Sequence, residues 1–260
     1  MAYENIICSV EKGVATIRLN RPDILNAFEF QMIEEFEDAT LKMARDEQVG
    51  AVIITGTGRA FSAGGDLKQM QKGFNTVAGR DYLTRSHPWL MQFVQMVKPV
   101  IAAVNGIAAG AGFSISLLCD FIFASDNATF SQPFIQVGLV PDMGSMYFLP
   151  RLVGLHRAKE LFVTGKRLTA AEAHAWGIVN RVVAGDSLLQ ESQEFGERLS
   201  AGPRTAIKLG KRIMNMSVNL SLEQLIEYES GAQAICFQTD DHLEAVRAFF
   251  EKRAPEFKGS

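Results

Sequence analysis

The sequence predicts an α/β core followed by a helical C-terminal region. Short apolar runs alternate with helix-length amphipathic segments up to about Val183, and this alternation is typical of α/β folds. Strand-strand-helix units recur loosely along this part of the chain. From Ser187 onward the apolar positions follow only helical spacing, most clearly over residues 221–236. We therefore expect an α/β core over residues 1–198 and a helical region over residues 199–260.

The strands of the core are predicted from two patterns. Residues 6–8 and 14–19 alternate loosely between apolar and polar side chains around the turn Lys12-Gly13, which indicates a hairpin. The later strands are short apolar runs, which are typical of strands buried on both faces. These runs cover residues 51–54, 100–104, 121–124, 128–130 and 178–183.

The helices of the core are predicted where apolar residues recur every three or four positions. Over residues 29–44, Met32, Ile33 and Phe36 share one face and acidic residues occupy the other. Further core helices are expected over residues 82–96 (with a kink near Pro88), 113–119, 145–149, 157–164 and 170–176.

Composition restricts the class of function. The chain has 260 residues, is 47% hydrophobic and carries a formal net charge of −3, as a compact soluble protein does. It has no basic block for nucleic acid, no apolar run that could span a bilayer and no signal-peptide pattern. Cys8, Cys119 and Cys236 are far apart, so free thiols are expected rather than disulfides or metal ligands. We expect a cytoplasmic protein without a metal site.

Two loops share one design, in which small residues lead from a strand into a helix. The first loop is Phe61-Ser-Ala-Gly-Gly-Asp-Leu-Lys68, and the second is Gly106-Ile-Ala-Ala-Gly-Ala-Gly112. Small residues leave the first N–H groups of the helix accessible, and the helix dipole adds positive charge there. Two such amides can hold one oxygen that becomes negative during a reaction. The alternative is that both loops are only tight connections.

Other motifs precede, separate and follow these loops over almost the whole chain. They are Leu19-Asn-Arg-Pro-x-x-Leu-Asn-Ala27, Val104-Asn-Gly106, Cys119-Asp120, Gly138-Leu-Val-Pro141, Leu149-Pro-Arg151 and Trp176-Gly-Ile-Val179. Together with the two loops, this pattern resembles the enoyl-CoA hydratase/isomerase family, also called the crotonase family. The resemblance implies a crotonase-like spiral of ββα units whose C-terminal helices form a homotrimer, or a hexamer made of two trimers. It also implies an acyl-CoA thioester as substrate and no cofactor besides the CoA of that substrate.

The resemblance also implies roles for residues of this chain. The backbone N–H groups of Gly65 and Ala111 would be the oxyanion donors. The positions implied to bind the acyl-CoA are Asp23, Ile24 and Leu25 along the CoA path, Ala63 and Leu67 at the adenine, Lys68 at a phosphate, and Asp66, Gly110, Ser114 and Phe134.

Two of these positions depart from the pattern of the hydratases. Family members that hydrate 2-enoyl-CoA carry two glutamates, which would fall at Ser114 and Phe134. Adding water to a double bond needs one group that activates the water and another that delivers a proton. A hydroxyl and a phenyl ring supply neither, so ordinary hydratase activity is not expected.

Asp142 is the remaining candidate for acid–base chemistry. Its neighbours Val140 and Met143, together with Phe134, would desolvate the carboxyl and raise its pKa, which suits a proton shuttle. Dienoyl-CoA isomerases and the ring-modifying isomerases of phenylacetate degradation place an aspartate here, and the sequence is most similar to the latter. We therefore predict an acyl-CoA isomerase; the alternative role for Asp142 is a helix N-cap.

Other readings of the sequence are less well supported. Within the family, a weak hydratase or a haloaryl-CoA dehalogenase remains open, as does a non-catalytic acyl-CoA-binding protein. A dinucleotide site is disfavoured because Ile115 stands where the third glycine of GxGxxG belongs. A serine-hydrolase elbow around Ser114 lacks its second glycine.

Overall fold

The computed structural model describes residues 3–71, 73 and 75–259, and it confirms an α/β fold with C-terminal helices. One sheet has six strands in the order β1-β2-β3-β5-β7-β10, and a second has four in the order β4-β6-β8-β9. The strands of the first sheet are β1 (Ile6–Glu11), β2 (Val14–Leu19), β3 (Ala51–Gly56), β5 (Val100–Val104), β7 (Phe121–Ser125) and β10 (Arg181–Val183). Those of the second are β4 (Ala60–Ser62), β6 (Ile107–Ala109), β8 (Thr129–Ser131) and β9 (Arg167–Thr169).

The chain winds as a spiral through both sheets. Strands β3, β5 and β7 are parallel neighbours in the first sheet, and each is followed directly by a strand of the second sheet, β4, β6 and β8 respectively. Helices return the chain to the next turn. Each turn therefore adds one strand to each sheet, so equivalent loops of successive turns lie side by side.

Helices cover the sheets and form the C-terminal region. Those of the core are α1 (Phe30–Arg45), α2 (Leu67–Met70), α3 (Thr76–Arg85), α4 (His87–Val94), α5 (Ala111–Leu118), α6 (Ser145–Val153), α7 (Leu155–Thr164), α8 (Ala170–Ala175) and α9 (Leu188–Ser200), with 3-10 turns η1 (Pro22–Ile24) and η2 (Pro133–Val137). Those of the C-terminal region are α10 (Arg204–Ser217), α11 (Leu222–Cys236) and α12 (Asp240–Glu251).

Several elements differ from the prediction, since the short strands β4, β6 and β9 and the one-turn helix α2 were not expected. The segment expected as one kinked helix is divided into α3 and α4 at Ser86, because Pro88 lies in the first turn of α4, where its missing N–H needs no partner. Strand β6 was not expected. Its residues, Ile-Ala-Ala, are too few and too small to give a strand pattern, and pairing with β4 and β8 forms it.

The core is packed by aromatic side chains on both faces of the first sheet. Phe36 of α1 meets Trp89 and Phe93 of α4, with ring centroids 5.6 Å and 6.2 Å away. On the other face, Phe195 of α9 packs against Phe121 and Phe123 of β7 at 5.0 Å and 5.1 Å. Helix α9 therefore belongs to the core.

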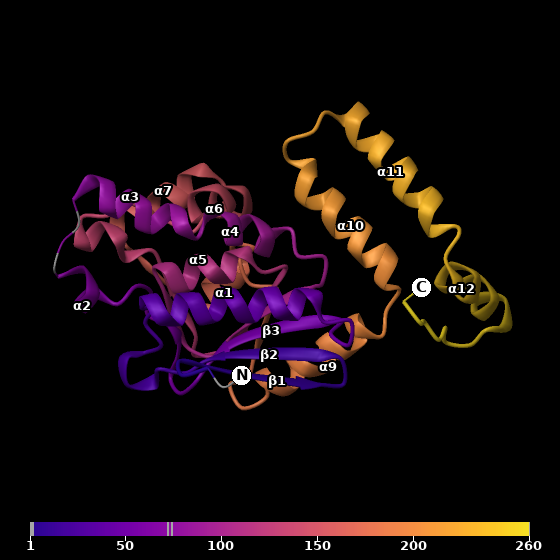
Figure 1. Ribbon diagram of the computed structural model, residues 1–260, viewed down its shortest axis with the longest axis horizontal. Coiled ribbons are helices and arrows are strands. Elements are labelled where there is room, and N and C mark those ends of the chain that lie inside the picture. Colours follow the sequence, from indigo (N-terminus) through magenta and orange to yellow (C-terminus); the bar gives the residue numbers. More distant parts are fainter. Residues whose placement is uncertain (1–2, 72, 74, 260) are drawn as a thin grey trace.

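Helices α10, α11 and α12 project from this core, and we call residues 204–259 the C-terminal arm (Figure 1). Helices α10 and α11 have no buried residue. The arm is attached by a few polar contacts, among which Lys211 Nζ lies 2.6 Å from Asp120 Oδ2. The arm thus contributes little to the core of its own chain.

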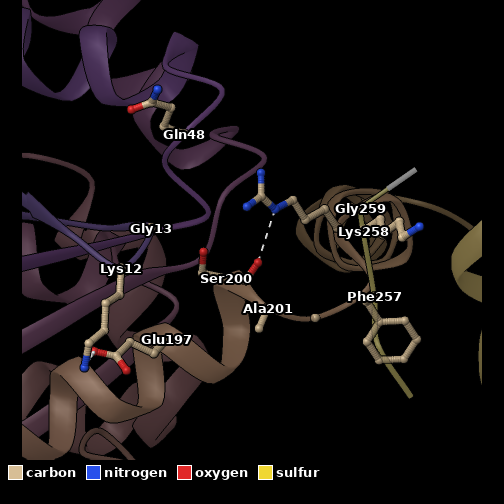
Figure 2. Close-up of a pocket in the computed structure, with 11 residues that line it drawn as sticks. Lys12, Gly13, Gln48, Glu197, Ser200, Ala201, Phe257, Lys258 and Gly259 are labelled. Carbon is tan, nitrogen blue, oxygen red and sulfur yellow. Dashed lines mark hydrogen bonds and ion pairs between the residues drawn. The ribbon is translucent and has the colours of Figure 1, made fainter.

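A cavity of about 340 Å³ lies where the arm meets the core (Figure 2). An ion pair of 3.4 Å between Lys12 and Glu197 lies in its wall, and Arg204 donates to the Ser200 carbonyl at 3.2 Å. The other lining residues are Gly13, Gln48, Ala201, Gly202, Phe257, Lys258 and Gly259. None of the residues predicted to bind substrate lines this cavity, so we treat it as the junction of the arm.

Two expectations from composition can be compared with the described residues. Cys8, Cys119 and Cys236 are free, as expected. Among residues 3–71, 73 and 75–259, none of the helices combines the length and the apolarity that crossing a membrane requires.

Candidate active site

The first glycine loop is fixed by a second segment of chain. After β4, Ala63 N–H donates to the Leu25 carbonyl at 2.9 Å. Phe28 N–H then donates to the Gly64 carbonyl at 2.7 Å, and Asp66 N–H donates to the Phe28 carbonyl at 2.8 Å, so Phe28 and Gly65 form a parallel bridge. In a parallel bridge of this kind, the two residues that flank Gly65 form the hydrogen bonds to Phe28. The N–H of Gly65 itself therefore points away from Phe28.

Asn26 holds that second segment in place. Its side chain is completely buried, and its Nδ2 donates to the carbonyls of Thr57 at 3.0 Å and Ala60 at 2.8 Å. The backbone carbonyl of Asn26 accepts a hydrogen bond from Ser62 Oγ at 2.8 Å. These bonds also set the position of the preceding residues predicted to line the CoA path, Asp23 and Ile24 in η1 and Leu25 directly after it.

The second loop lies directly against the first. Strands β4 and β6 are parallel neighbours, and Gly110 follows β6 with a φ of 53°. A Cβ placed on Gly64 would lie 3.2 Å from the nitrogen of Ala111 and 2.9 Å from the oxygen of Ala109, so a larger residue at 64 would separate the loops. The close contact therefore requires glycine.

This contact brings the two predicted donors to the ends of adjacent strands. Gly65 and Ala111 are both half-buried, so their amides lie at the border between core and solvent. Ala111 is the first residue of α5, and its N–H has no partner within the helix. Adjacent strands are about 4.8 Å apart, a spacing at which two N–H groups can reach a single oxygen.

Asp142 lies in the segment between η2 and α6. One carboxylate oxygen, Oδ1, is buried and has no hydrogen-bond partner among the described residues. Burial raises the pKa of Asp142 to about 6, although its own backbone N–H opposes the shift. The N-cap of α6 is Gly144, so the alternative that Asp142 caps this helix is wrong.

A small space lined by aromatic side chains lies beside the first loop. A cavity of about 10 Å³ adjoins Gly65, since the methyl group of Met70 would lie 2.8 Å from a Cβ placed on that glycine. Burial raises the pKa of Tyr82, which lines this cavity, and the nearby carboxylate of Asp142 raises it further. The other lining residues are Phe28, Phe30, Asp66 and Gln69.

The chain as a whole matches a known family. The family model described as enoyl-CoA hydratase/isomerase matches residues 9–260. The chain belongs to the enoyl-CoA hydratase/isomerase family. This finding confirms the resemblance seen in the sequence, and the protein is an enzyme of that family, whose members act on acyl-CoA thioesters.

Relatives of both activities are similar to this family member. It is 38% identical to a probable enoyl-CoA hydratase of Rhizobium meliloti over 99% of each chain. It is 35% identical to the 1,2-epoxyphenylacetyl-CoA isomerase of Escherichia coli, over 98% of this chain and 99% of that one. The crystal structure of an enoyl-CoA hydratase from Bacillus anthracis superposes with a TM-score of 0.93 at 34% identity, covering 99% of this chain and 100% of that one. The crotonase fold is thereby confirmed.

The two positions at which the resemblance implies glutamates in hydratases, Ser114 and Phe134, lie beside the second loop. Ser114 is completely buried, and its hydroxyl donates to the Gly110 carbonyl at 3.1 Å, so it serves the helix. The Phe134 ring would lie 3.8 Å from a Cβ placed on Gly110. Both side chains therefore belong to the wall beside Gly110, and neither is acidic.

The remaining predicted residues lie on or near α2. Asp66 is the N-cap of this helix, and its carboxylate accepts from Lys68 N–H at 3.0 Å. The side chains of Leu67 and Lys68 are exposed, as residues that meet a CoA group at the surface would be. Ala63 is half-buried beside Leu25. Their binding of substrate stays a prediction.

Four residues of this region were not singled out from the sequence: Phe30, Met70, Tyr82 and Gln132. In the sequence, an aromatic residue or a methionine at a helical position looks the same whether it packs in the core or lines a site. Gln132 stands two residues before Phe134, but its complete burial depends on tertiary packing and is visible only in the structure.

Proposed function

We propose that this family member is an acyl-CoA isomerase in which Asp142 is the proton shuttle. The observation that supports this most strongly is the contrast between the acidic positions. Ser114 and Phe134 stand where the hydratases would carry glutamates. Asp142, in contrast, is desolvated, has one oxygen without a partner among the described residues, and has a pKa of about 6. A carboxylate of this kind takes up and releases protons readily near neutral pH.

The proposed reaction is a 1,3 proton shift. The carbonyl oxygen of the thioester accepts hydrogen bonds from the N–H groups of Gly65 and Ala111. Asp142 removes a proton from one carbon of the acyl chain, and the electron pair of that C–H bond moves toward the thioester oxygen as an enolate. The two amides stabilise the enolate, and each is expected to contribute on the order of 3 kcal/mol to the transition state.

The carboxylic acid formed on Asp142 then returns its proton to the carbon at the other end of the enolate. The double bond has moved, and the composition of the substrate is unchanged. The apolar environment favours this step, because a desolvated carboxylic acid is a ready proton donor. No cofactor takes part in the proposed reaction, and CoA enters only as part of the substrate.

The experiment follows both mass and ultraviolet absorbance. The protein is incubated with 3-enoyl-CoA, 2-enoyl-CoA and ring-epoxide CoA thioesters, alongside an Asp142→Asn variant. A spectral change at constant mass that is lost in the variant supports the isomerase. A gain of one water indicates the hydratase, and binding without change indicates a non-catalytic acyl-CoA protein.

We also propose that the C-terminal arm joins this chain to further copies of itself, as a homotrimer or a hexamer. Helices α10 and α11 bury no residue within the chain, and large apolar side chains along the arm are exposed. They are Met214, Val218, Leu222, Ile226, Tyr228, Ile235, Phe237, Leu243, Val246, Phe249 and Phe250. An exposed apolar face of this extent is typical of an oligomer interface.

A further inference from the structure

The cavity where the arm meets the core is separate from the proposed acyl-CoA site. It has a volume of about 340 Å³, within the range of pockets that bind small molecules. Its walls come from the turn between β1 and β2, from the segment that joins α9 to α10, and from residues 257–259 of the arm (Figure 2). None of the described residues that line it is assigned to the acyl-CoA site, so a molecule bound here would be a second ligand of the protein.

The arm side of this cavity is held in place by Asp241. The residue is only 3% exposed, and its carboxylate accepts hydrogen bonds from the N–H groups of Lys258 at 2.7 Å and Gly259 at 3.0 Å. A Cβ placed on Gly259 would lie 2.9 Å from Cδ of Arg204, so the end of the arm packs against the start of α10. Hydrogen bonds and close packing therefore fix this wall.

Arg204, the first residue of α10, brings a positive charge to the cavity. Its Nε donates to the Ser200 carbonyl at 3.2 Å and its Nη1 to the Glu47 carbonyl at 3.0 Å, and both acceptors are neutral. Within the described part of the chain, Arg204 forms no ion pair with a carboxylate. A guanidinium has five N–H groups, so its two bonds to carbonyls orient it and leave donors for an anion.

Ser200 supplies a buried hydroxyl on the core side. The residue is 6% exposed and lines the cavity, and its hydroxyl has no hydrogen bond among the residues that the structure describes. A Cβ placed on Gly13 or on Gly50 would lie 2.4 Å or 2.3 Å from this oxygen, so two glycines make room for it. A buried hydroxyl without a partner is rare in native proteins and is available to a ligand.

The N-terminus of α10 adds to the positive potential. This helix has 14 residues, and its N-cap, Pro203, makes no side-chain hydrogen bond to the first turn. The first N–H groups of a helix have no partner within it, and the helix dipole places partial positive charge there. Together with Arg204 and Ser200, this terminus favours an anion.

The charged side chains around the cavity also favour an anion. Three cations and one carboxylate line it, namely Lys12, Arg204, Lys258 and Glu197. Next to Arg204 but outside the cavity lie one cation and two carboxylates, Lys98, Asp46 and Glu47. The lining groups sum to +2 and the outer groups to −1, which leaves the neighbourhood with a net charge of +1.

We infer that the junction cavity binds the phosphate group of a small molecule through the guanidinium of Arg204 and the hydroxyl of Ser200. The guanidinium can donate to two phosphate oxygens, and the hydroxyl can donate to a third. Donors from separate segments suit a tetrahedral phosphate better than a planar carboxylate. Because the donors come from α9 and α10, the bound phosphate connects the arm to the core.

The test measures phosphate binding at constant ionic strength. Inorganic phosphate and glucose 6-phosphate are titrated into the full-length protein by calorimetry, with KCl as the balancing salt. We expect a Kd of about 1 mM for inorganic phosphate and a melting temperature higher by about 3–5 °C at ten times that concentration. Tighter binding of glucose 6-phosphate would assign the site to phosphate esters, and equal binding to free phosphate. A KCl control that raises the melting temperature as much as phosphate does would overturn the inference.

Two variants test the proposed donors. Arg204→Gln should weaken phosphate binding by about tenfold or more, because it removes a charge-assisted donor. Ser200→Ala removes only the hydroxyl and should weaken binding by about three- to tenfold, which tests the site even if Arg204→Gln disturbs the junction. Unchanged phosphate affinity in both variants would contradict the inference.

The matched control is Arg212→Gln. Arg212 is an exposed arginine of the same helix that does not line the cavity, so this variant loses the same charge and should keep the wild-type phosphate affinity. An equal loss in Arg212→Gln and Arg204→Gln would mean that phosphate responds only to overall charge, which overturns the site. Acyl-CoA binding is measured in parallel and should be unchanged in all three variants, so a failure of the phosphate site leaves the proposed function standing.

Discussion

Asp142 combines an unpaired buried oxygen with a raised pKa, and both properties affect its chemistry. The Asp142→Asn variant keeps the shape of the side chain but cannot accept a proton. We expect turnover to fall by a factor of about 10² to 10⁴, the usual contribution of a general base. Acyl-CoA affinity should stay within about twofold, since the oxyanion donors are intact. Calorimetry and steady-state rates measure the two effects, and full activity in the variant would refute the role.

The same carboxyl predicts how activity and stability depend on pH. Because the ionised form is the base, kcat/KM should rise with pH and level off above about 6. The folded protein holds this proton more tightly than the unfolded chain, so the contribution of Asp142 to stability decreases as pH rises from 3.8 to about 6. Thermal scans of wild-type protein and Asp142→Asn across this range should show a larger advantage for the variant at the upper end. A constant difference would contradict the shift.

The N–H group of Ala111, the second proposed oxyanion donor, can be removed by a substitution that introduces no polar or charged side chain. Ala111 is the first residue of α5, a position where proline is tolerated, so Ala111→Pro deletes the N–H and leaves the helix in place. We expect kcat to fall by about 10² to 10³. Ala111→Gly is the matched control, because it keeps the N–H and should keep the activity. A fall of equal size in both variants would show that the site responds to packing and not to the hydrogen bond.

Individual residues differ in how far the sequence alone could predict them. The Asn-Gly and Gly-Ala-Gly loops could be predicted from the sequence, because a close backbone contact requires glycine, as at Gly64 and Gly110. Gln132 leaves none, because a glutamine after a strand is usually solvated and only tertiary packing buries it. The helix-capping alternative for Asp142 was wrong because the chain makes one further turn, and Gly144 takes the cap.

At the scale of elements, one largely buried ion pair contributes to the contact between α10 and the core. Lys211 and Asp120 are 10% and 21% exposed, and Asp120 also accepts from Val100 N–H at 2.7 Å. Lys211→Met leaves the carboxylate without its cation, which should reduce the free energy of unfolding by about 3 kcal/mol at neutral pH. Urea denaturation measures this, with the exposed Lys208→Met as control.

The loss in Lys211→Met should shrink as the solution is acidified. Burial raises the pKa of Asp120 and Lys211 opposes that rise, so removing the lysine raises the pKa further. Protonation at low pH then removes the uncompensated charge. A loss that is independent of pH would mean that the contact acts through packing alone.

Elements with strong patterns were predicted well, and those formed by pairing were not. Strand β3 is a continuous apolar run, helix α1 has helical periodicity over 16 residues, and both are present. Strand β6 has three residues and exists because β4 and β8 supply its hydrogen bonds. Such a strand depends on its neighbours, which a local pattern does not contain.

At the scale of the whole molecule, the exposed arm predicts self-association. Phe249 and Phe250 of α12 are 77% and 78% exposed. Phe250→Asp places a charge on this apolar face and should shift a trimer or hexamer toward the monomer, as light scattering would detect. Gln190→Asp, which puts the same charge on the exposed side of α9 in the core, should leave the molar mass unchanged. A wild-type protein that is already monomeric would contradict the proposal.

The adjacency of β4 and β6 has a consequence for how such a protein can diverge. The spacing of neighbouring strands sets the positions of the two amides. The long excursion between them, which includes α2, α3 and α4, places Met70 beside Gly65. Mutations and length changes in that excursion can remodel the acyl pocket while the electrophile-binding geometry is inherited intact. Under the proposed function, we expect substrate choice and enolate stabilisation to be separable traits, which a library randomised only over the excursion would test.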